Sequence, residues 1–131
     1  MILSSFSNRY QSPLYYKSLE ILQLAQHISK YLSDDLSPLK SNGEENQEVY
    51  LTGDIVQQSF SIGPHILKAE KQPFQDEKHH HVISALLLSN KLYRSCKKLE
   101  HVNSNGKEYL PIILKEIKRF RKSLHQWLTA L

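Results

Sequence analysis

The chain has 131 residues, a length typical of one domain that buries its own core. It carries 17 basic and 13 acidic side chains, for a formal net charge of +4, and its 4 glycines and 5 prolines exclude a collagen-like or low-complexity protein. The single cysteine, Cys96, excludes an internal disulfide and is typical of a reducing compartment.

The first predicted helix covers about residues 13–33. Ser12 is a suitable N-cap, and Pro13 fits the first helical position because proline lacks an N–H group. Apolar and small residues recur three or four positions apart, which predicts one buried helix face. This face comprises Leu14, Ser18, Ile21, Ala25, Ile28 and Leu32. Pro38 and the Asn42-Gly43 pair then predict a polar connection to the second helix.

The second predicted helix covers about residues 48–71 and ends before Pro73. Its principal apolar face comprises Leu51, Ile55, Ser59, Ile62, Ile66 and Ala69. A second apolar row lies about a quarter-turn away and comprises Val56, Phe60, Gly63 and Leu67. Pro64 removes a backbone donor inside this pattern, so we expect a kink near residues 60–63.

The third predicted helix covers about residues 75–101 and the fourth about residues 108–130, with a turn at residues 103–106. The apolar face of the third comprises Val82, Ala85, Leu86, Ser89, Leu92, Tyr93, Cys96 and Leu99. That of the fourth comprises Leu110, Ile113, Ile117, Phe120, Leu124, Trp127 and Leu131. Four amphipathic helices with short connections predict a single all-α domain over residues 1–131, an antiparallel up-down-up-down four-helix bundle.

Some apolar residues lie outside these four principal faces. Phe60 and Leu67 belong to the second row of the second helix, and Ile83 and Leu87 point away from the apolar face of the third. Unused apolar faces on a small bundle indicate contacts between subunits, so we expect a homo-oligomer. The alternatives are isolated exposed residues, which are common, and a second helix that contacts both of its neighbours within one bundle.

Charge is unevenly distributed along the chain. Residues 1–66 contain four basic and seven acidic residues, for a net charge of −3, whereas residues 67–131 contain thirteen and six, for +7. The basic residues on the third and fourth helices are Lys91, Arg94, Lys97, Lys98, Lys115, Lys118, Arg119, Arg121 and Lys122. The two helices are sequential and antiparallel, so we expect these residues to form one basic patch. Such a patch predicts binding to the phosphate backbone of RNA or DNA. The alternatives are a solvated basic surface and one that meets an acidic protein.

The three consecutive histidines His79–His81 are the main candidates for metal chemistry, but their spacing argues against a metal site. Consecutive helical residues point about 100° apart, so these side chains cannot bind one ion from one helix face. Glu77 and His80 form one Glu-x-x-His motif, whereas dinuclear carboxylate bundles need two. A solvated helix start is therefore favoured, and a metal-dependent enzyme built on Glu77 and His80 is the alternative.

The remaining residues give no sign of catalysis. Cys96 lies on the buried face of the third helix, where a thiol is inert. There is no glycine-rich phosphate loop, and no Ser-His-Asp arrangement can be inferred from spacing. Tyr93 and Trp127 belong to predicted buried faces, which favours contact with a nucleic-acid backbone over stacking on bases. We therefore expect a protein that is not an enzyme and that holds neither metal nor cofactor.

Residues 57–66 resemble the second-helix signature of a bacterial four-helix-bundle family. Its members include proteins encoded in intervening sequences of 23S rRNA genes and the accessory variability determinants of diversity-generating retroelements. Ser61, Ile62 and Ile66 match the family pattern. The departures are Gly63 in place of proline, His65 in place of asparagine, Lys68 in place of glutamate and Ala69 in place of glycine. Glu116, Ile117, Arg119 and Trp127 are similar to the final helix of the retroelement branch.

The resemblance implies a non-enzymatic bundle that assembles into a ring-like homo-oligomer, often a pentamer. In the retroelement branch such a ring is basic and binds a reverse transcriptase and nucleic acid. The rRNA branch implies a protein-interaction module without direct nucleic-acid binding. The first ten residues lack the pattern of a signal peptide, and no apolar run approaches the ~20 residues that span a bilayer, so we expect a cytoplasmic protein without a membrane partner.

Overall fold

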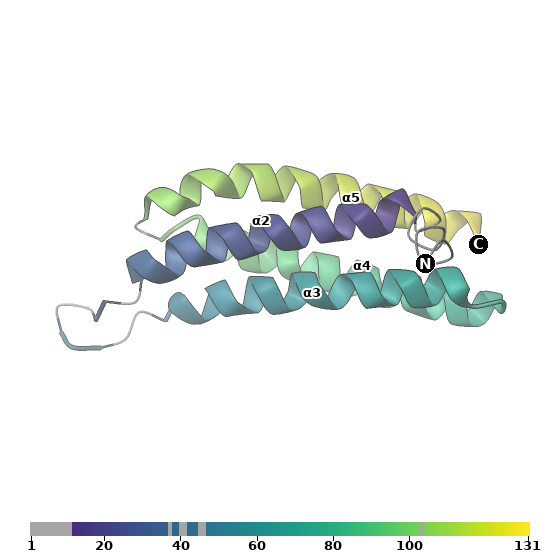
Figure 1. Cartoon of the computed structure of the whole chain (residues 1–131), viewed down its shortest axis with the longest axis horizontal. Coiled ribbons are helices and arrows are strands. Elements are labelled where there is room, and N and C mark those ends of the chain that lie inside the picture. The colour runs from purple at the N-terminus through teal and green to yellow at the C-terminus, as the bar shows by residue number, and fades with distance from the viewer. Residues whose placement is uncertain (1–11, 37, 40–41, 45–46, 103) are drawn as a thin grey trace, which may run out of the picture.

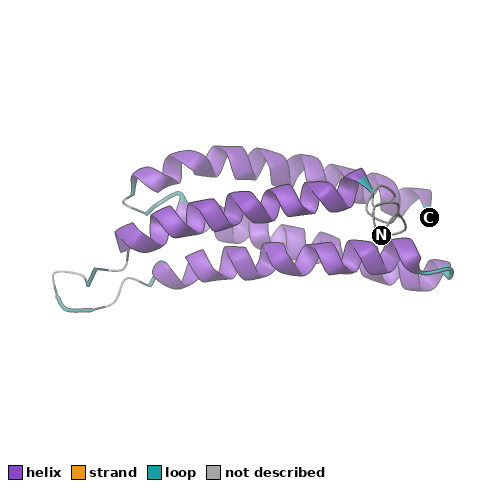
Figure 2. Cartoon of the chain, viewed as in Figure 1, coloured by secondary structure: helices purple, strands orange, loops and turns teal. Residues whose placement is uncertain are grey.

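The computed structural model describes residues 12–36, 38–39, 42–44, 47–102 and 104–131. Within these residues the regular structure is helical and contains no strand (Figures 1 and 2). The long helices there are α2 (Pro13–Leu36), α3 (Val49–Lys71), α4 (Gln75–Leu99) and α5 (Leu110–Ala130), and a short 3-10 helix, η1 (Asn105–Tyr109), precedes α5. The predicted all-α fold of four long helices is confirmed.

Helix α2 begins where the sequence predicts and ends three residues later. The backbone N–H of Tyr15 donates to Oγ of Ser12 at 3.0 Å, which confirms Ser12 as the N-cap. The added turn buries Leu36, four positions after Leu32, and Ser104 donates a hydrogen bond to the carboxylate of Asp35 in the same turn. These tertiary contacts stabilise the extra turn, and contacts of this kind supply most helical stability in proteins.

The connection between α4 and α5 is more structured than a simple turn. The third helix ends at Leu99 rather than residue 101, and residues 105–109 form η1 before α5 begins. Oγ of Ser104 accepts a hydrogen bond from the backbone N–H of Gly106 at 3.0 Å. A Cβ atom on Gly106 would lie 3.0 Å from Cβ of Tyr31, so a glycine here lets η1 pass close to α2.

Each long helix contributes one face to a common core. The core comprises Ile21, Ala25, Ile28, Leu32, Leu36, Ile55, Ile62, Ile66, Ala69, Val82, Ala85, Leu86, Leu92, Cys96, Leu99, Val102, Leu110, Ile113, Leu114, Ile117, Phe120 and Leu124. The predicted apolar faces are therefore largely confirmed. The residues of those faces that are only partly buried are Leu14, Leu51, Tyr93, Trp127 and Leu131. Ser59 and Ser89 are buried among these apolar residues. Their hydroxyls stay hydrogen-bonded there because they donate to backbone carbonyls one turn earlier, at 2.6 and 2.8 Å.

The helices pack in a closed order, α2 against α3, α3 against α4, α4 against α5, and α5 against α2 (Figure 1). Two long-range hydrogen bonds join helix ends. Nζ of Lys78, in the first turn of α4, donates to the carbonyl of Ala69 near the end of α3 at 2.9 Å. Nε2 of Gln75, also at the start of α4, donates to the carbonyl of Leu131, just after α5, at 3.1 Å. These contacts fix the register between neighbouring helices.

Gly63 and Pro64 lie together in α3 where it faces α2. A Cβ atom on Gly63 would lie 3.3 Å from Oγ of Ser18 and 3.3 Å from Cε1 of Tyr15, so the glycine allows close approach of the two helices. Pro64 has no N–H group to contribute to the helical hydrogen bonds. Helix α3 nevertheless continues through Pro64 to Lys71.

Candidate nucleic-acid interface

A shallow hollow of about 290 Å³ lies between α4 and α5, on the side where their basic residues meet. We call it the α4–α5 groove. It is lined by Tyr93, Lys97, Glu100, Pro111, Leu114, Lys115 and Lys118. Lysines from both helices therefore border one concave surface, as the sequence predicts for a merged basic patch.

Tyr93 occupies the floor of the α4–α5 groove and is covered by two cations from α5. Cζ of Arg121 lies 4.6 Å from the centre of the tyrosine ring, and Nζ of Lys118 lies 5.9 Å from it. Both distances are within the range of cation–π attraction. Nη1 of Arg121 also donates to Oδ1 of Asn90 at 3.1 Å, which holds the guanidinium in place. Tyr93 packs against the core, as the sequence predicts, and it also forms part of the basic surface.

The nine predicted binding residues do not all line the α4–α5 groove. Lys97, Lys115, Lys118 and Arg121 meet at the α4–α5 groove, and Arg94 and Lys122 are exposed on the same two helices. Lys98 follows Lys97 by one residue, and Lys91 precedes Lys97 by six. Around an α-helix these offsets place both side chains about 100–120° from Lys97, in the same direction, towards the α3 side of α4.

Arg119 does not line the α4–α5 groove. It follows Lys115 by four residues, which places it about 40° further round α5, towards Glu116 and α2. Nη1 of Arg119 lies 3.7 Å from a carboxylate oxygen of Glu116, whose other oxygen lies 3.5 Å from Nζ of Lys17 in α2. Arg119 is exposed on α5 like Lys115 and Lys118, but Glu116 balances part of its charge outside the α4–α5 groove. Such exposed pairs contribute little to stability, so their main effect here is on the position of the charge.

Acidic residues also modulate the charge of the groove itself. Nζ of Lys97 lies 2.9 Å from Glu100, and the hydrogen bond and the charge of Glu100 raise the pKa of Lys97. Lys97 therefore stays charged, but part of its field is balanced by its neighbour. Among the basic residues on this side, Arg94, Lys115, Lys118 and Lys122 form no ion pair within the described part of the chain. They are therefore the cations best placed to meet an external phosphate.

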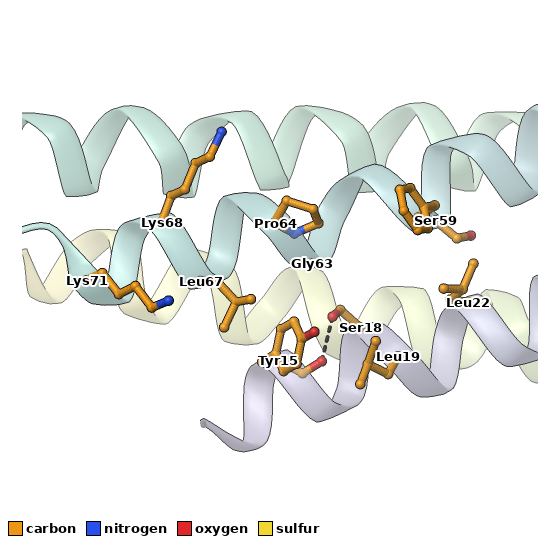
Figure 3. A pocket seen from close by; sticks show the side chains of 11 residues that line it. Tyr15, Ser18, Leu19, Leu22, Ser59, Gly63, Pro64, Leu67, Lys68 and Lys71 are labelled. Carbon is orange, nitrogen blue, oxygen red and sulfur yellow. Dashed lines mark hydrogen bonds between the residues drawn. The ribbon is translucent and has the colours of Figure 1, made fainter. Parts of the chain in front are cut away.

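A second hollow, of about 380 Å³, lies between α2 and α3 and is mainly apolar (Figure 3). We call it the α2–α3 groove. Its lining comprises Tyr15, Ser18, Leu19, Leu22, Ser59, Phe60, Gly63, Pro64, Leu67, Lys68 and Lys71. Two of the four predicted subunit-contact residues, Phe60 and Leu67, lie here, and Phe60 is 61% exposed.

The other two predicted contact residues belong to a different surface. Leu87 is 61% exposed on α4 and Ile83 is half-buried, one turn before it. No α4 residue lines the α2–α3 groove. The predicted contact residues therefore form two separate apolar patches, one at the α2–α3 groove and one on α4.

The histidine run is partly drawn into the contact between α3 and α4. His79 and His80 are exposed, whereas His81 is half-buried and its Nδ1 lies 3.2 Å from Nδ1 of His65 in α3. Sequence spacing missed His65, because its nearness to His81 depends on the register of two helices rather than on a repeat along one. Among the described residues, no group of three or more His, Cys, Asp or Glu is arranged to hold a metal ion.

Cys96 lies in the core, and burial raises the pKa of its thiol to about 12. A thiol in this environment is protonated at neutral pH and is a poor nucleophile. The position on the inner face of α4 agrees with the sequence prediction.

Comparison of the chain with protein-family models, with curated proteins and with solved structures found no match. The resemblance to the four-helix-bundle family thus stays a prediction. In the part of the chain that the structure describes, no helix is both long and apolar enough to cross a membrane.

Proposed function

We propose that this protein is a non-enzymatic accessory or scaffold protein that binds the phosphate backbone of RNA or DNA through α4 and α5. The observation that carries the proposal is the α4–α5 groove, where three lysines line one hollow with Tyr93, and Arg121 lies over the tyrosine ring. The lysines are Lys97, Lys115 and Lys118. Lysine and arginine side chains on rigid helices release counterions when they meet phosphates, which gives affinity with little sequence reading.

The proposal includes an antiparallel up-down-up-down bundle. Its support is that the start of α4 contacts both the end of α3, through Lys78 and Ala69, and the end of α5, through Gln75 and Leu131. In this arrangement α4 and α5 are neighbours along their length, so cations from both helices share one surface.

We further propose that copies of the bundle assemble into a ring-like homo-oligomer, with a pentamer as the form that the family resemblance suggests. Two different apolar patches, Phe60 with Leu67 and Ile83 with Leu87, support this idea. When one patch of a protomer meets the other patch of the next, the contact is heterologous and closes a ring if the rotation permits.

The resemblance also suggests a partner, the reverse transcriptase of a diversity-generating retroelement. A reverse-transcriptase gene beside this one, with paired template and variable repeats, would support that branch. Placement within an rRNA gene would support the other.

The second candidate function is a protein-interaction module without direct nucleic-acid binding. The observation that favours it is the apolar α2–α3 groove, bordered by Lys68 and Lys71, which suits a partner with apolar and acidic side chains better than a nucleic acid. On this alternative, the basic surface on α4 and α5 meets an acidic protein.

Fluorescence anisotropy with a labelled DNA duplex and a labelled RNA strand, between low and high salt, tests the proposal. We expect affinity to fall steeply with salt, with a slope of about 0.9 per phosphate contact on duplex DNA. The double variant Lys118→Glu/Lys122→Glu should lower that slope by about 2. Its matched control is Lys68→Glu/Lys71→Glu, which makes the same change in net charge at the α2–α3 groove.

If the two double variants lose DNA affinity equally, net charge alone governs binding. That result would contradict the assignment of nucleic-acid binding to the α4–α5 groove. Polyglutamate with a total charge similar to that of the DNA is the probe that distinguishes the two candidate functions, because it is an acidic polypeptide without phosphate. An affinity for polyglutamate that equals or exceeds the affinity for DNA would favour the protein-interaction module.

Light scattering tests the assembly. The wild-type protein should be a multimer, and Leu87→Asp and Phe60→Asp should each lower its mass towards that of one chain. Ile112→Asp is the control, because Ile112 is 51% exposed on α5 and lies outside both apolar patches. A monomeric wild type, or equal dissociation by the control, would contradict the oligomer.

A further inference from the structure

Two histidines join α3 to α4 at a point that the proposed nucleic-acid surface does not use. Nδ1 of His65 and Nδ1 of His81 lie 3.2 Å apart, and their ring centres lie 5.5 Å apart. His80 adjoins the pair, with its ring centre 5.3 Å from that of His81. Both His65 and His81 are half-buried, so each side chain is partly open to solvent and partly packed between the helices.

The separation of the two nitrogens suits a shared metal ion. Zinc binds imidazole nitrogen at about 2.0–2.1 Å, and two such ligands at a tetrahedral angle lie about 3.3 Å apart. Without an ion, the same 3.2 Å contact needs one Nδ1 to donate its proton to the other, so the two histidines must be opposite tautomers.

The surroundings keep the two histidines in place. Helices α3 and α4 are joined by only three residues, and Lys78 fixes their register by donating to the carbonyl of Ala69 at 2.9 Å.

We propose that His65 and His81 bind one divalent transition-metal ion through their Nδ1 atoms and so clamp α3 to α4. Imidazole nitrogen suits zinc, nickel and copper, whereas magnesium and calcium prefer oxygen. The described residues offer no third close ligand of the usual kinds, so water completes the coordination and the ion stays exchangeable. This inference is independent of the proposed nucleic-acid binding.

Calorimetric titration of metal-free, untagged protein with zinc chloride tests the proposal. We expect one ion per chain, no comparable heat with magnesium chloride, and a rise in the unfolding temperature as zinc concentration increases. His65→Ala and His81→Ala should each weaken zinc binding by at least about 10-fold, since loss of even an outer-shell partner costs about 10- to 100-fold. His101→Ala is the matched control, because His101 is exposed and remote in sequence from the pair.

The design separates the histidine pair from other sources of zinc binding. Far-ultraviolet circular dichroism checks that each variant folds, and His81→Gln, which keeps a hydrogen-bonding side chain, replaces His81→Ala if that variant does not. Wild-type protein that binds no zinc would overturn the proposal. Equal binding by wild type and His65→Ala would also overturn it, because the exposed histidines would then take up the ion.

Discussion

The α4–α5 groove and the α2–α3 groove are built on the same core by pairs of adjacent helices, yet they offer a partner different chemistry. In the first, lysines and an arginine surround one aromatic ring. In the second, leucines, a tyrosine and an exposed phenylalanine surround a glycine, and two lysines stand at the border. One surface suits a polyanion and the other an apolar side chain.

The two grooves differ in chemistry because α5 and α3 carry different side chains next to their buried faces. Helix α5 continues its core face with Arg121 and Lys118, whose charged groups lie over the ring of Tyr93. Helix α3 continues its core face with Phe60 and Leu67. A small bundle can thus carry two independent surfaces without changing its core, and the predictions below test that independence.

The largest effect should come from the shared core. Phe120 is 2% exposed, and Phe120→Ala should lower the free energy of unfolding by about 3–5 kcal/mol. Urea denaturation measures the change, and binding at both grooves should weaken together. Lys122→Ala, two residues away and exposed, is the control and should change stability by less than about 0.5 kcal/mol. A small loss for Phe120→Ala would mean that the core is not shared as described.

The reactivity of Cys96 tests whether the basic groove opens into the core. Burial raises the pKa of Cys96 from 9.0 to about 12, which lowers its thiolate fraction near pH 8 by about a thousandfold. Reaction with a disulfide reagent should therefore be at least that much slower in the native protein than in urea. Saturating DNA should leave the native rate unchanged, and a rate that changes with DNA would link the groove to the core.

A substitution at Gly63 should alter the α2–α3 groove alone. Gly63→Leu would force a side chain against Ser18 and Tyr15, and should destabilise the protein by about 1–3 kcal/mol. Gly53→Ala is the control, because a Cβ there meets nothing within 4 Å, and it should stabilise α3 by about 0.5–1 kcal/mol. DNA affinity of folded Gly63→Leu should match wild type; a large loss would show that the two surfaces are coupled.

The smallest effect should come from the aromatic floor of the basic groove. A double-mutant cycle with Tyr93→Leu and Arg121→Gln should give a coupling free energy of about 0.5–1 kcal/mol, the value of a partly exposed cation–π pair. Chemical denaturation of the four proteins measures it. Tyr93→Phe should retain the coupling, since the ring face and not the hydroxyl meets the guanidinium. A coupling free energy of zero would mean that Tyr93 contributes only by packing and not by attraction to Arg121.

The helices and their buried faces were predictable because each is a repeat along one segment of the chain. The spacing of Ile113, Ile117, Phe120 and Leu124 predicts a buried face, and all four are buried. The end of α2 was missed because Leu36 and Asp35 are stabilised by tertiary contacts that no local signal shows.

The surfaces were less predictable because they depend on how two helices align. Lys115 and Lys118 line the same groove as Lys97, whereas Arg119 does not, because it lies towards Glu116, which contacts Lys17 in α2. Tyr93 stands at the edge of its apolar row, so spacing could not decide between core and surface. The contact between His65 and His81 required the register of α3 against α4.

Pro64 gives the apolar groove a property that its side chains alone would not provide. Because proline has no N–H, Pro64 cannot donate the usual helical hydrogen bond to the carbonyl oxygen of Phe60, and both residues line the groove. A carbonyl without that bond keeps acceptor capacity, which is directional, whereas contact between apolar side chains is not. The chemistry that matches this stretch of the α2–α3 groove is therefore an apolar side chain with a hydrogen-bond donor beside it.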